Sequence, residues 1–169
     1  QANYFNCFSH KIFKIEFYGG SALTDNIEVP KNNTVESIPQ NIPVTYVPSR
    51  NIVFLAFAAG YAEANSIDDI YIGVNAIDYS GYPDCRQEFI NGFERLINQS
   101  TKKGIEGKKF KIITPLLNLT KKEIINLGKK NGVNFSKTSS CYNPVQKKRC
   151  GFCDSCLLRK RGFEEAAIT

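Results

Sequence analysis

Methionine, long apolar runs and a secretory signal are all missing from this sequence of 169 residues. Without a methionine, we expect that the natural N-terminus is processed, removed or not shown. The longest nearly uncharged apolar run, residues 52–62, is far shorter than the roughly 20 residues of a bilayer span, so no membrane-spanning segment is expected. Residues 1–10 show no basic start with an apolar stretch and cleavage site, which makes the cytoplasm the expected location.

The composition excludes disorder and collagen as the main state. Apolar residues make up 42% and charged residues 22%, with only 12 glycines and seven prolines. The length fits one globular domain with its own core. A net charge of +6 and a pI near 9.0 suit an anionic partner, although solubility alone explains them as well.

Strand and helix patterns alternate along the chain. Strands are expected at residues 11–17, 44–47, 69–75 and 110–113, and helices at residues 49–64, 86–100 and 120–130. The helix at 49–64 is apolar nearly all round and the strand at 69–75 nearly continuously apolar, so both should be buried on several sides. Thr120 and Glu123 form a capping box. This order predicts an α/β fold with a parallel sheet and flanking helices, and a site beyond the carboxyl ends of the strands.

A long polar stretch, residues 18–41, predicts a surface loop. Its start, Gly19-Gly20-Ser21-Ala22-Leu23-Thr24-Asp25, superficially suggests a phosphate-binding loop. A phosphate loop needs a helix whose first amides point at the anion, and here a polar stretch with Pro30 follows instead. We therefore reject this motif as a phosphate site.

Four of the six cysteines lie within 16 residues, at Cys141, Cys150, Cys153 and Cys156. Two overlapping Cys-x2-Cys pairs with a fourth cysteine nearby predict a closed structural zinc site, with an iron–sulfur cluster as the alternative. Gly151 permits the tight turn between the ligands. Four thiolates and one Zn²⁺ would lower the net charge from +6 to about +4.

The surroundings of the cysteines are basic. The basic side chains are Lys137, Lys147, Lys148, Arg149, Arg159, Lys160 and Arg161. They indicate either an RNA-binding knuckle or a solvated rim around a structural ion.

Residues 73–86 join a buried strand to an amphipathic helix and contain Asp78, Tyr79, Tyr82, Asp84 and Arg86. Each has an ordinary structural explanation: a turn, half-buried packing or a helix cap. Together, at the end of a strand, they indicate a site for a polar heterocycle.

The chain resembles the 7-cyano-7-deazaguanine synthase family of queuosine and archaeosine biosynthesis. The resemblance runs through residues 19–24, 48–51, 73–86, 114–116, 140–142 and 150–156, of which 73–86 and the cysteine segments are the most specific. It implies an adenine-nucleotide α-hydrolase-like (Rossmann-like) domain over residues 1–136 and a zinc-binding region over residues 137–169.

The implied activity is that of an ATP-dependent ligase, a nitrile synthase. It converts 7-carboxy-7-deazaguanine and ammonia to 7-cyano-7-deazaguanine and uses two ATP, with Mg²⁺. The resemblance allows for a homodimer, and nucleic acid is not expected as a partner. Family members begin with a strand and a Ser-Gly-Gly-x-Asp-Ser pyrophosphate loop, and no residue before Lys11 matches them. We therefore expect the 169 residues alone to be inactive.

The resemblance also implies site residues. Arg50 and Asn51 would contact nucleotide or substrate, and the strand end and following loop would hold the deazaguanine. The implied binding residues are Arg50, Asn51, Gly73, Asn75, Asp78, Tyr79, Asp84 and Arg86. Cys85 is expected to be pocket wall, because no covalent step is needed and the only histidine, His10, is distant in sequence.

Two other functions stay open at this point. A related ATP-pyrophosphatase could act on another substrate, in tRNA thiolation or amide ligation. A non-enzymatic zinc module could bind RNA through the basic rim, although the sequence has no aromatic-rich stacking motif.

Overall fold

The computed structural model describes residues 2–15, 19–32, 34–39, 41–77 and 81–168. Its regular elements are, in chain order, η1 (Val35–Ser37), α1 (Arg50–Ala64), β1 (Asp69–Tyr71), η2 (Pro83–Cys85), α2 (Gln87–Ser100), α3 (Lys102–Ile105), β2 (Lys111–Ile113), α4 (Lys121–Lys130), η3 (Phe135–Lys137) and α5 (Asp154–Glu165). Within the described residues, no helix is long and apolar enough to cross a membrane.

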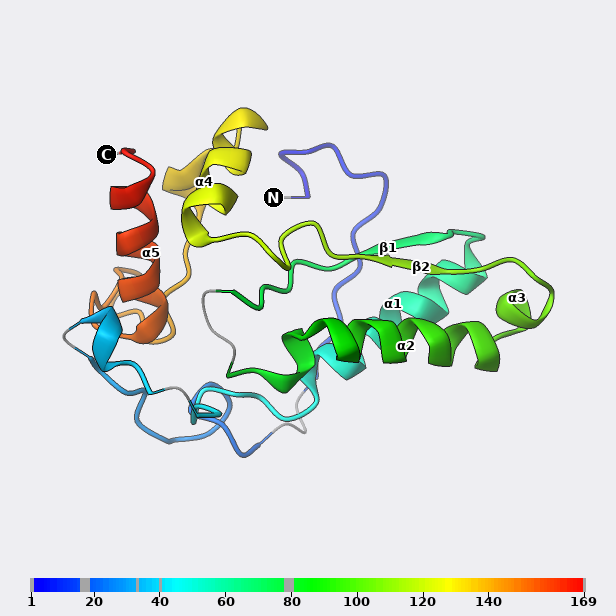
Figure 1. Ribbon diagram of the computed structural model, residues 1–169, viewed down its shortest axis with the longest axis horizontal. Helices are drawn as coiled ribbons and strands as arrows, with labels where there is room; N and C mark the ends of the chain where they lie inside the picture. Colours follow the sequence, from blue (N-terminus) through cyan, green and yellow to red (C-terminus); the bar gives the residue numbers. More distant parts are fainter. Residues whose placement is uncertain (1, 16–18, 33, 40, 78–80, 169) are drawn as a thin grey trace.

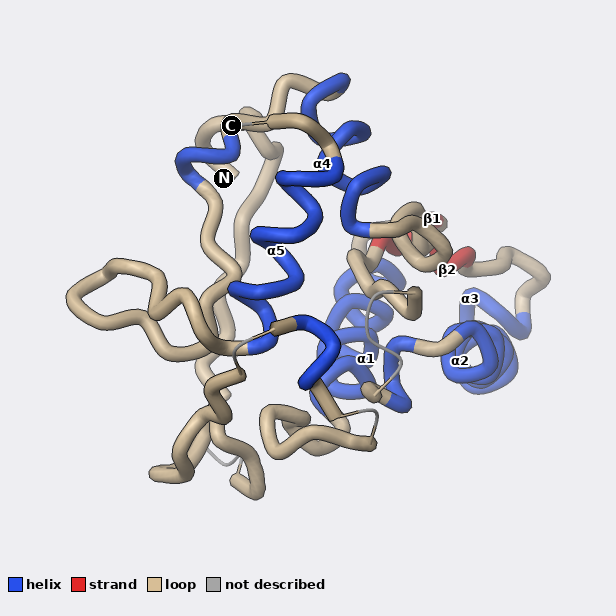
Figure 2. Tube along the Cα trace, turned by 60° about the vertical axis from the view of Figure 1, so that its left-hand side comes forward, coloured by secondary structure: helices blue, strands red, loops and turns tan. Residues whose placement is uncertain are grey.

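The two strands form a parallel pair, as the sequence predicts. Ile70 lies opposite Ile112, and the pairing continues beyond the strand through the amide of Ile72, which donates to the carbonyl of Ile113 at 3.1 Å. Helices α1 and α2 lie on the same side of this sheet (Figures 1 and 2). The core forms between these helices and the strands; its buried residues are Leu55, Ala59, Ala62, Ile70, Val74, Cys85, Ile90, Phe93, Ile97, Phe110, Ile112 and Leu117.

Burial of α1 and β1 is less complete than their sequences predict. Leu55 of α1 is buried, but Phe54 and Phe57 are each nearly half exposed. On β1, Ile70 is buried and Tyr71 is 66% exposed. In the described chain, each element therefore buries one face, and the expectation of cover on several sides is wrong here.

Two expected strands are absent from the described residues. Residues 11–15 have no regular structure, and Phe13 instead stacks on Phe57 of α1 with ring centroids 5.0 Å apart; residues 16 and 17 lie outside the described part. Residues 44–47 form a turn in which the amide of Tyr46 donates to the carbonyl of Pro43 at 2.9 Å. Among the residues that the structure describes, neither segment lies beside a partner strand, and alternating apolar residues alone do not make a strand.

Side chains of α2 bond the outer edge of β2. Glu94 Oε2 accepts the amide of Ile112 at 2.7 Å, while Asn98 accepts the amide and donates to the carbonyl of Phe110 at 2.8 and 3.0 Å. These bonds satisfy edge groups of β2 that would otherwise be free to pair with another strand.

Helix α4 begins and ends as its sequence predicts. Thr120 accepts the amide of Glu123 at 3.3 Å, and the Glu123 carboxylate accepts the amide of Thr120 at 2.8 Å, which completes the capping box. Asn131 is the C-cap, and Gly132 follows it with φ of +72°. The capping box is confirmed, and α4 ends at residue 130, where the expected helix ends.

Helices α4 and α5 pack closely at one end of the molecule (Figures 1 and 2). Gly162 of α5 allows this approach, because a Cβ there would lie 2.8 Å from Cβ of Lys121 and 3.0 Å from Cδ1 of Ile125. Through this contact α5 packs against α4. The division into two regions between residues 136 and 137 stays a prediction.

Gly162→Ala is expected to destabilise the protein by about 1–3 kcal/mol, because the new methyl group must force α4 and α5 apart. Gly92→Ala is the matched control: a Cβ at this helical position of α2 meets nothing within 4 Å. The control should stabilise by about 0.5–1 kcal/mol through helix propensity. Urea unfolding measures both, and equal effects of the two substitutions would contradict the close contact at Gly162.

Candidate functional site

A cavity of about 720 Å³ lies between the end of β1, the start of α1, and helices α4 and α5. Its strand-end wall consists of residues 72–75, and its other walls include Arg50, Asn51, Tyr82 and Tyr142. The cavity therefore lies beyond the carboxyl end of a parallel strand, where the sequence predicts the site.

The start of α1 is held in place by η2. Asn51 donates its backbone N–H to Asp84 Oδ2 at 3.1 Å and its side-chain amide to the carbonyl of Asp84 at 3.0 Å. Ser49 is the N-cap residue, but its φ of +56° is left-handed and its side chain makes no capping bond. The carboxylate of Asp84 thus accepts a buried amide at the start of α1 and positions Arg50 and Asn51 at the cavity.

The implied site residues fall into three groups. Arg50, Asn51, Gly73 and Asn75 line the cavity. Asp84 is buried against the start of α1, and Arg86 is the exposed N-cap residue of α2. Neither residue is among the described residues that line the cavity. Asp78 and Tyr79 lie outside the described residues. The binding roles assigned to all eight residues stay predictions.

Asn75 connects the two strand ends. Its side-chain amide donates to the carbonyls of Leu116 and Leu119, both at 2.7 Å, and the amide of Ala76 donates to the carbonyl of Leu117 at 3.0 Å. These bonds fix the loop after β2 against the loop after β1. The wall formed by residues 73–75 is consequently well anchored.

Three hydroxyl groups form a chain from the loop before α1 to the cysteine region. Thr45 Oγ1 lies 3.0 Å from the hydroxyl of Tyr82, which lies 3.3 Å from the hydroxyl of Tyr142. Burial raises the pKa of Tyr142 far above its ordinary value, so this phenol stays protonated. Both tyrosines line the cavity.

Cys85 lines the same cavity and belongs to the core. Burial, followed by the neighbouring charge of Asp84, raises the pKa of its thiol. A thiol with a raised pKa is a poor nucleophile. Its position agrees with the expectation that Cys85 is pocket wall.

The sequence interpretation missed the contribution of the C-terminal region to the cavity. Thr138, Ser140 and Tyr142 from the loop before the cysteines, and Asp154 and Arg159 of α5, all line it. The sequence indicates Arg159 only as part of the basic rim, because residue spacing alone does not show that its side chain lies at the cavity. The Ser140-Cys141-Tyr142 segment, which is part of the family resemblance, was the available sign in the sequence that this region contributes to the cavity.

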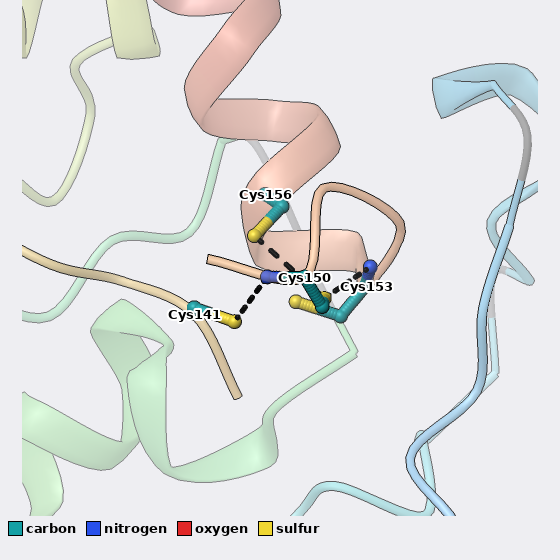
Figure 3. Close-up of side chains that lie close together, drawn as sticks. All are labelled: Cys141, Cys150, Cys153 and Cys156. Carbon is teal, nitrogen blue, oxygen red and sulfur yellow. Dashed lines mark hydrogen bonds between the residues drawn. The ribbon is translucent and has the colours of Figure 1, made fainter. Parts of the chain in front are cut away.

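The four clustered cysteines converge as predicted. Their ligand sulfurs all lie within 4.8 Å of one another, and the sulfurs of Cys150 and Cys156 are 4.0 Å apart (Figure 3). A tetrahedral ion about 2.3 Å from each sulfur requires sulfurs about 3.8 Å apart, so the arrangement fits a metal ion. The amide of Cys153 also donates to the sulfur of Cys150 at 3.4 Å, which stabilises a thiolate there.

The pKa values of the clustered cysteines indicate that a cation is needed to hold all four as thiolates. Burial raises the pKa of Cys153, and raises that of Cys156 to about 12. Burial also acts to raise the pKa of Cys150, but hydrogen bonds from the amides of Phe152 and Cys153, together with those of the Cys141 and Cys153 side chains, lower it to about 7. Four thiolates so close together and partly buried require a positive ion to hold them deprotonated.

The loop that contains Gly19 packs onto the cysteine cluster. Ala22 and Val29 form a small core with Cys153 and Cys156, and Asn32 donates to Oδ1 of Asp154 at 2.5 Å. The amide of Gly20 donates to Asp25 Oδ2 at 2.6 Å, and the described residues 19–32 contain no helix. As the sequence predicts, no helix follows these glycines within residues 19–32, and a carboxylate of the loop itself accepts the amide of Gly20.

Comparison with known proteins gives consistent matches over nearly the whole chain. A family model described as "Queuosine biosynthesis protein QueC" matches residues 2–167. A 7-cyano-7-deazaguanine synthase of Citrifermentans bemidjiense is 57% identical over 158 residues, which cover 93% of this chain and 68% of the relative. The synthase of Acetivibrio thermocellus is 56% identical over 166 residues, 98% of this chain and 72% of the relative. That of Myxococcus xanthus is 57% identical over 151 residues, 89% of this chain and 66% of the relative.

Proposed function

Because this chain belongs to the QueC family of queuosine biosynthesis proteins, we propose that its cavity serves the synthesis of 7-cyano-7-deazaguanine. The observation that carries the proposal is the family match across the residues that build the cavity, from Arg50 to Arg159. The substrates we propose are 7-carboxy-7-deazaguanine, ammonia and ATP with Mg²⁺.

The chemistry requires two activations. A carboxylate is a poor electrophile, so its oxygen first attacks the α-phosphorus of ATP and releases pyrophosphate. Ammonia then displaces AMP and gives the amide. The amide oxygen then attacks the α-phosphorus of a second ATP and releases a second pyrophosphate. Loss of AMP and two protons from this intermediate leaves the nitrile.

The described residues suit this sequence of steps. Arg50 at the cavity wall supplies positive charge for a carboxylate or phosphate. Phe54 and Tyr82 provide aromatic surface for a flat heterocycle. The hydroxyls of Tyr82 and Tyr142 offer donors and acceptors to its polar edge.

We propose zinc as the ion of the cysteine cluster. Four sulfur ligands leave no place for water, which is typical of a structural rather than a catalytic site. The ion would fix the loop at Cys141 to the start of α5, and both contribute to the cavity wall. When bound, it supplies folding energy and no reactive group.

The function is tested with the full-length enzyme, 7-carboxy-7-deazaguanine, ammonium and ATP. We expect mass spectrometry to find the nitrile, and ATP consumption to require both other substrates. Guanine is the control substrate and should not support turnover, because it has no carboxylate to activate. A thiolated product, or ATP turnover without the deazaguanine, would point to a different ATP-pyrophosphatase reaction.

Three further expectations stay predictions. The 169 residues alone can be assayed beside the full-length enzyme to test whether they are inactive. Light scattering would test for a homodimer, and cell fractionation would test the cytoplasmic location.

A further inference from the structure

Two buried polar atoms at the cavity wall have no hydrogen-bond partner among the described residues: Oγ of Ser140 and Nε of Arg159. Both residues line the same cavity. A buried donor without a partner is costly, and such groups are rare in folded proteins. Two of them on one wall indicate that a ligand completes their bonding.

Arg159 is already fixed in place without its Nε. Its Nη2 donates to Thr138 Oγ1 at 2.8 Å and to the carbonyl of Phe135 at 3.2 Å. The guanidinium carbon lies 4.8 Å from the ring centre of Phe163, in a cation–π contact. One part of the guanidinium therefore holds the loop, and the Nε–H is a rigid donor left for another acceptor.

The charge of the cavity indicates what that acceptor is. Besides two tyrosines, the ionisable side chains among its described lining residues are Arg50, Lys121, Arg159, Asp154 and the thiol of Cys85. The carboxylate of Asp154 accepts a bond from Asn32, and the thiol stays protonated because its pKa is raised. Cationic groups thus outnumber the carboxylate, which favours an anionic ligand.

We propose that Arg159 Nε and Ser140 Oγ bind an oxyanion of the substrates in this cavity. The inference rests on the proposed function and adds specificity-determining residues to it. Two sources share this chemistry: the carboxylate of the deazaguanine and a phosphate of the nucleotide. Both accept charge-assisted hydrogen bonds, which are the strong ones.

The test compares the binding of three ligands to the full-length enzyme by calorimetry: 7-carboxy-7-deazaguanine, the neutral 7-cyano-7-deazaguanine, and ATP. The variants are Arg159→Lys, which keeps the charge without the Nε donor, and Ser140→Ala. Each should weaken binding of the anionic ligand by about tenfold or more, the usual effect of losing a hydrogen bond to a charged group. Binding of the neutral nitrile should change by less than about twofold.

Arg149→Lys is the matched control. Arg149 also donates to the Thr138 segment, at 3.2 Å to its carbonyl, but it is not among the described residues that line the cavity. This control should bind all three ligands like the wild type. Metal content and thermal midpoint are measured on every variant, and if Arg159→Lys fails to fold, Ser140→Ala carries the test.

The ligand affected identifies the source of the oxyanion. Weakened binding of the acid alone assigns the pair to the carboxylate, and weakened binding of ATP alone assigns it to a phosphate. Unchanged affinity of both variants for both anions overturns the inference. If the wild type bound neither deazaguanine, the proposed function would fail separately, while the ATP measurements would still decide the inference.

Discussion

Cys153→Ser is expected to abolish metal binding and to unfold the C-terminal region. The sulfur of Cys153 is fully buried within the cluster, and the small core around it joins Ala22 and Val29 to the cysteines. The segment from residue 138 to residue 153 contains only one isolated bridge, between Val145 and Lys148, so little regular structure supports it without an ion. Binding of structural zinc contributes about 10–16 kcal/mol in isolated zinc fingers, so its loss outweighs the whole stability of an average domain.

Elemental analysis and hydrogen exchange of residues 138–165 measure this result. One zinc per chain is expected in the wild type and none in Cys153→Ser. Cys7→Ser is the control, because Cys7 is exposed and far from the cluster in sequence, and it should keep the metal. Iron in the wild type would support the iron–sulfur alternative, and unchanged zinc in Cys153→Ser would refute the site.

Asp84→Ala is expected to lower both stability and turnover. The carboxylate is buried, accepts the amide of Asn51, and places negative charge at the start of α1. Its removal leaves a buried amide unpaired, which costs about 1.5–3 kcal/mol. Because Arg50 and Asn51 line the cavity, their displacement should reduce kcat/KM at least about tenfold.

Asp84→Asn separates this structural role from direct contact with the heterocycle. It keeps an acceptor for the amide of Asn51 but loses the charge, so a helix cap predicts a loss of about 1 kcal/mol or less and nearly normal turnover. Direct recognition of the heterocycle's N–H donors instead predicts a large rise in KM without a loss of stability. Urea unfolding and kinetics on the same samples of the full-length enzyme distinguish the two.

Arg86→Ala completes the comparison. A contact with substrate predicts a fall in activity of about tenfold or more. A side chain at the exposed start of α2 predicts nearly unchanged turnover. Nearly unchanged turnover would show that Arg86 is not a binding residue. The role of Asp84 would then be decided by its own two variants.

Local interactions allowed the sequence to predict α1, α2, α4 and the convergence of the four clustered cysteines, but α3 and α5 were not predicted. The apolar periodicity of α2, the Thr120–Glu123 capping box and the stop at Asn131 are set by residues within a few positions of one another. The cysteine spacing likewise determines which sulfurs can meet around one ion. The parallel pairing of β1 and β2 followed from the helical connection between them.

The tertiary structure alone decided where long-range partners lie. Residues 11–15 and 44–47 have strand-like sequences, but no strand lies beside them in the described part of the chain, and a strand requires a partner for its backbone bonds. The carboxylate of Asp84 caps a helix that begins 34 residues before it, and Arg159 reaches the cavity from the far end of the chain. Sequence patterns report which side chains share a face of one element, whereas such contacts depend on how separate elements pack.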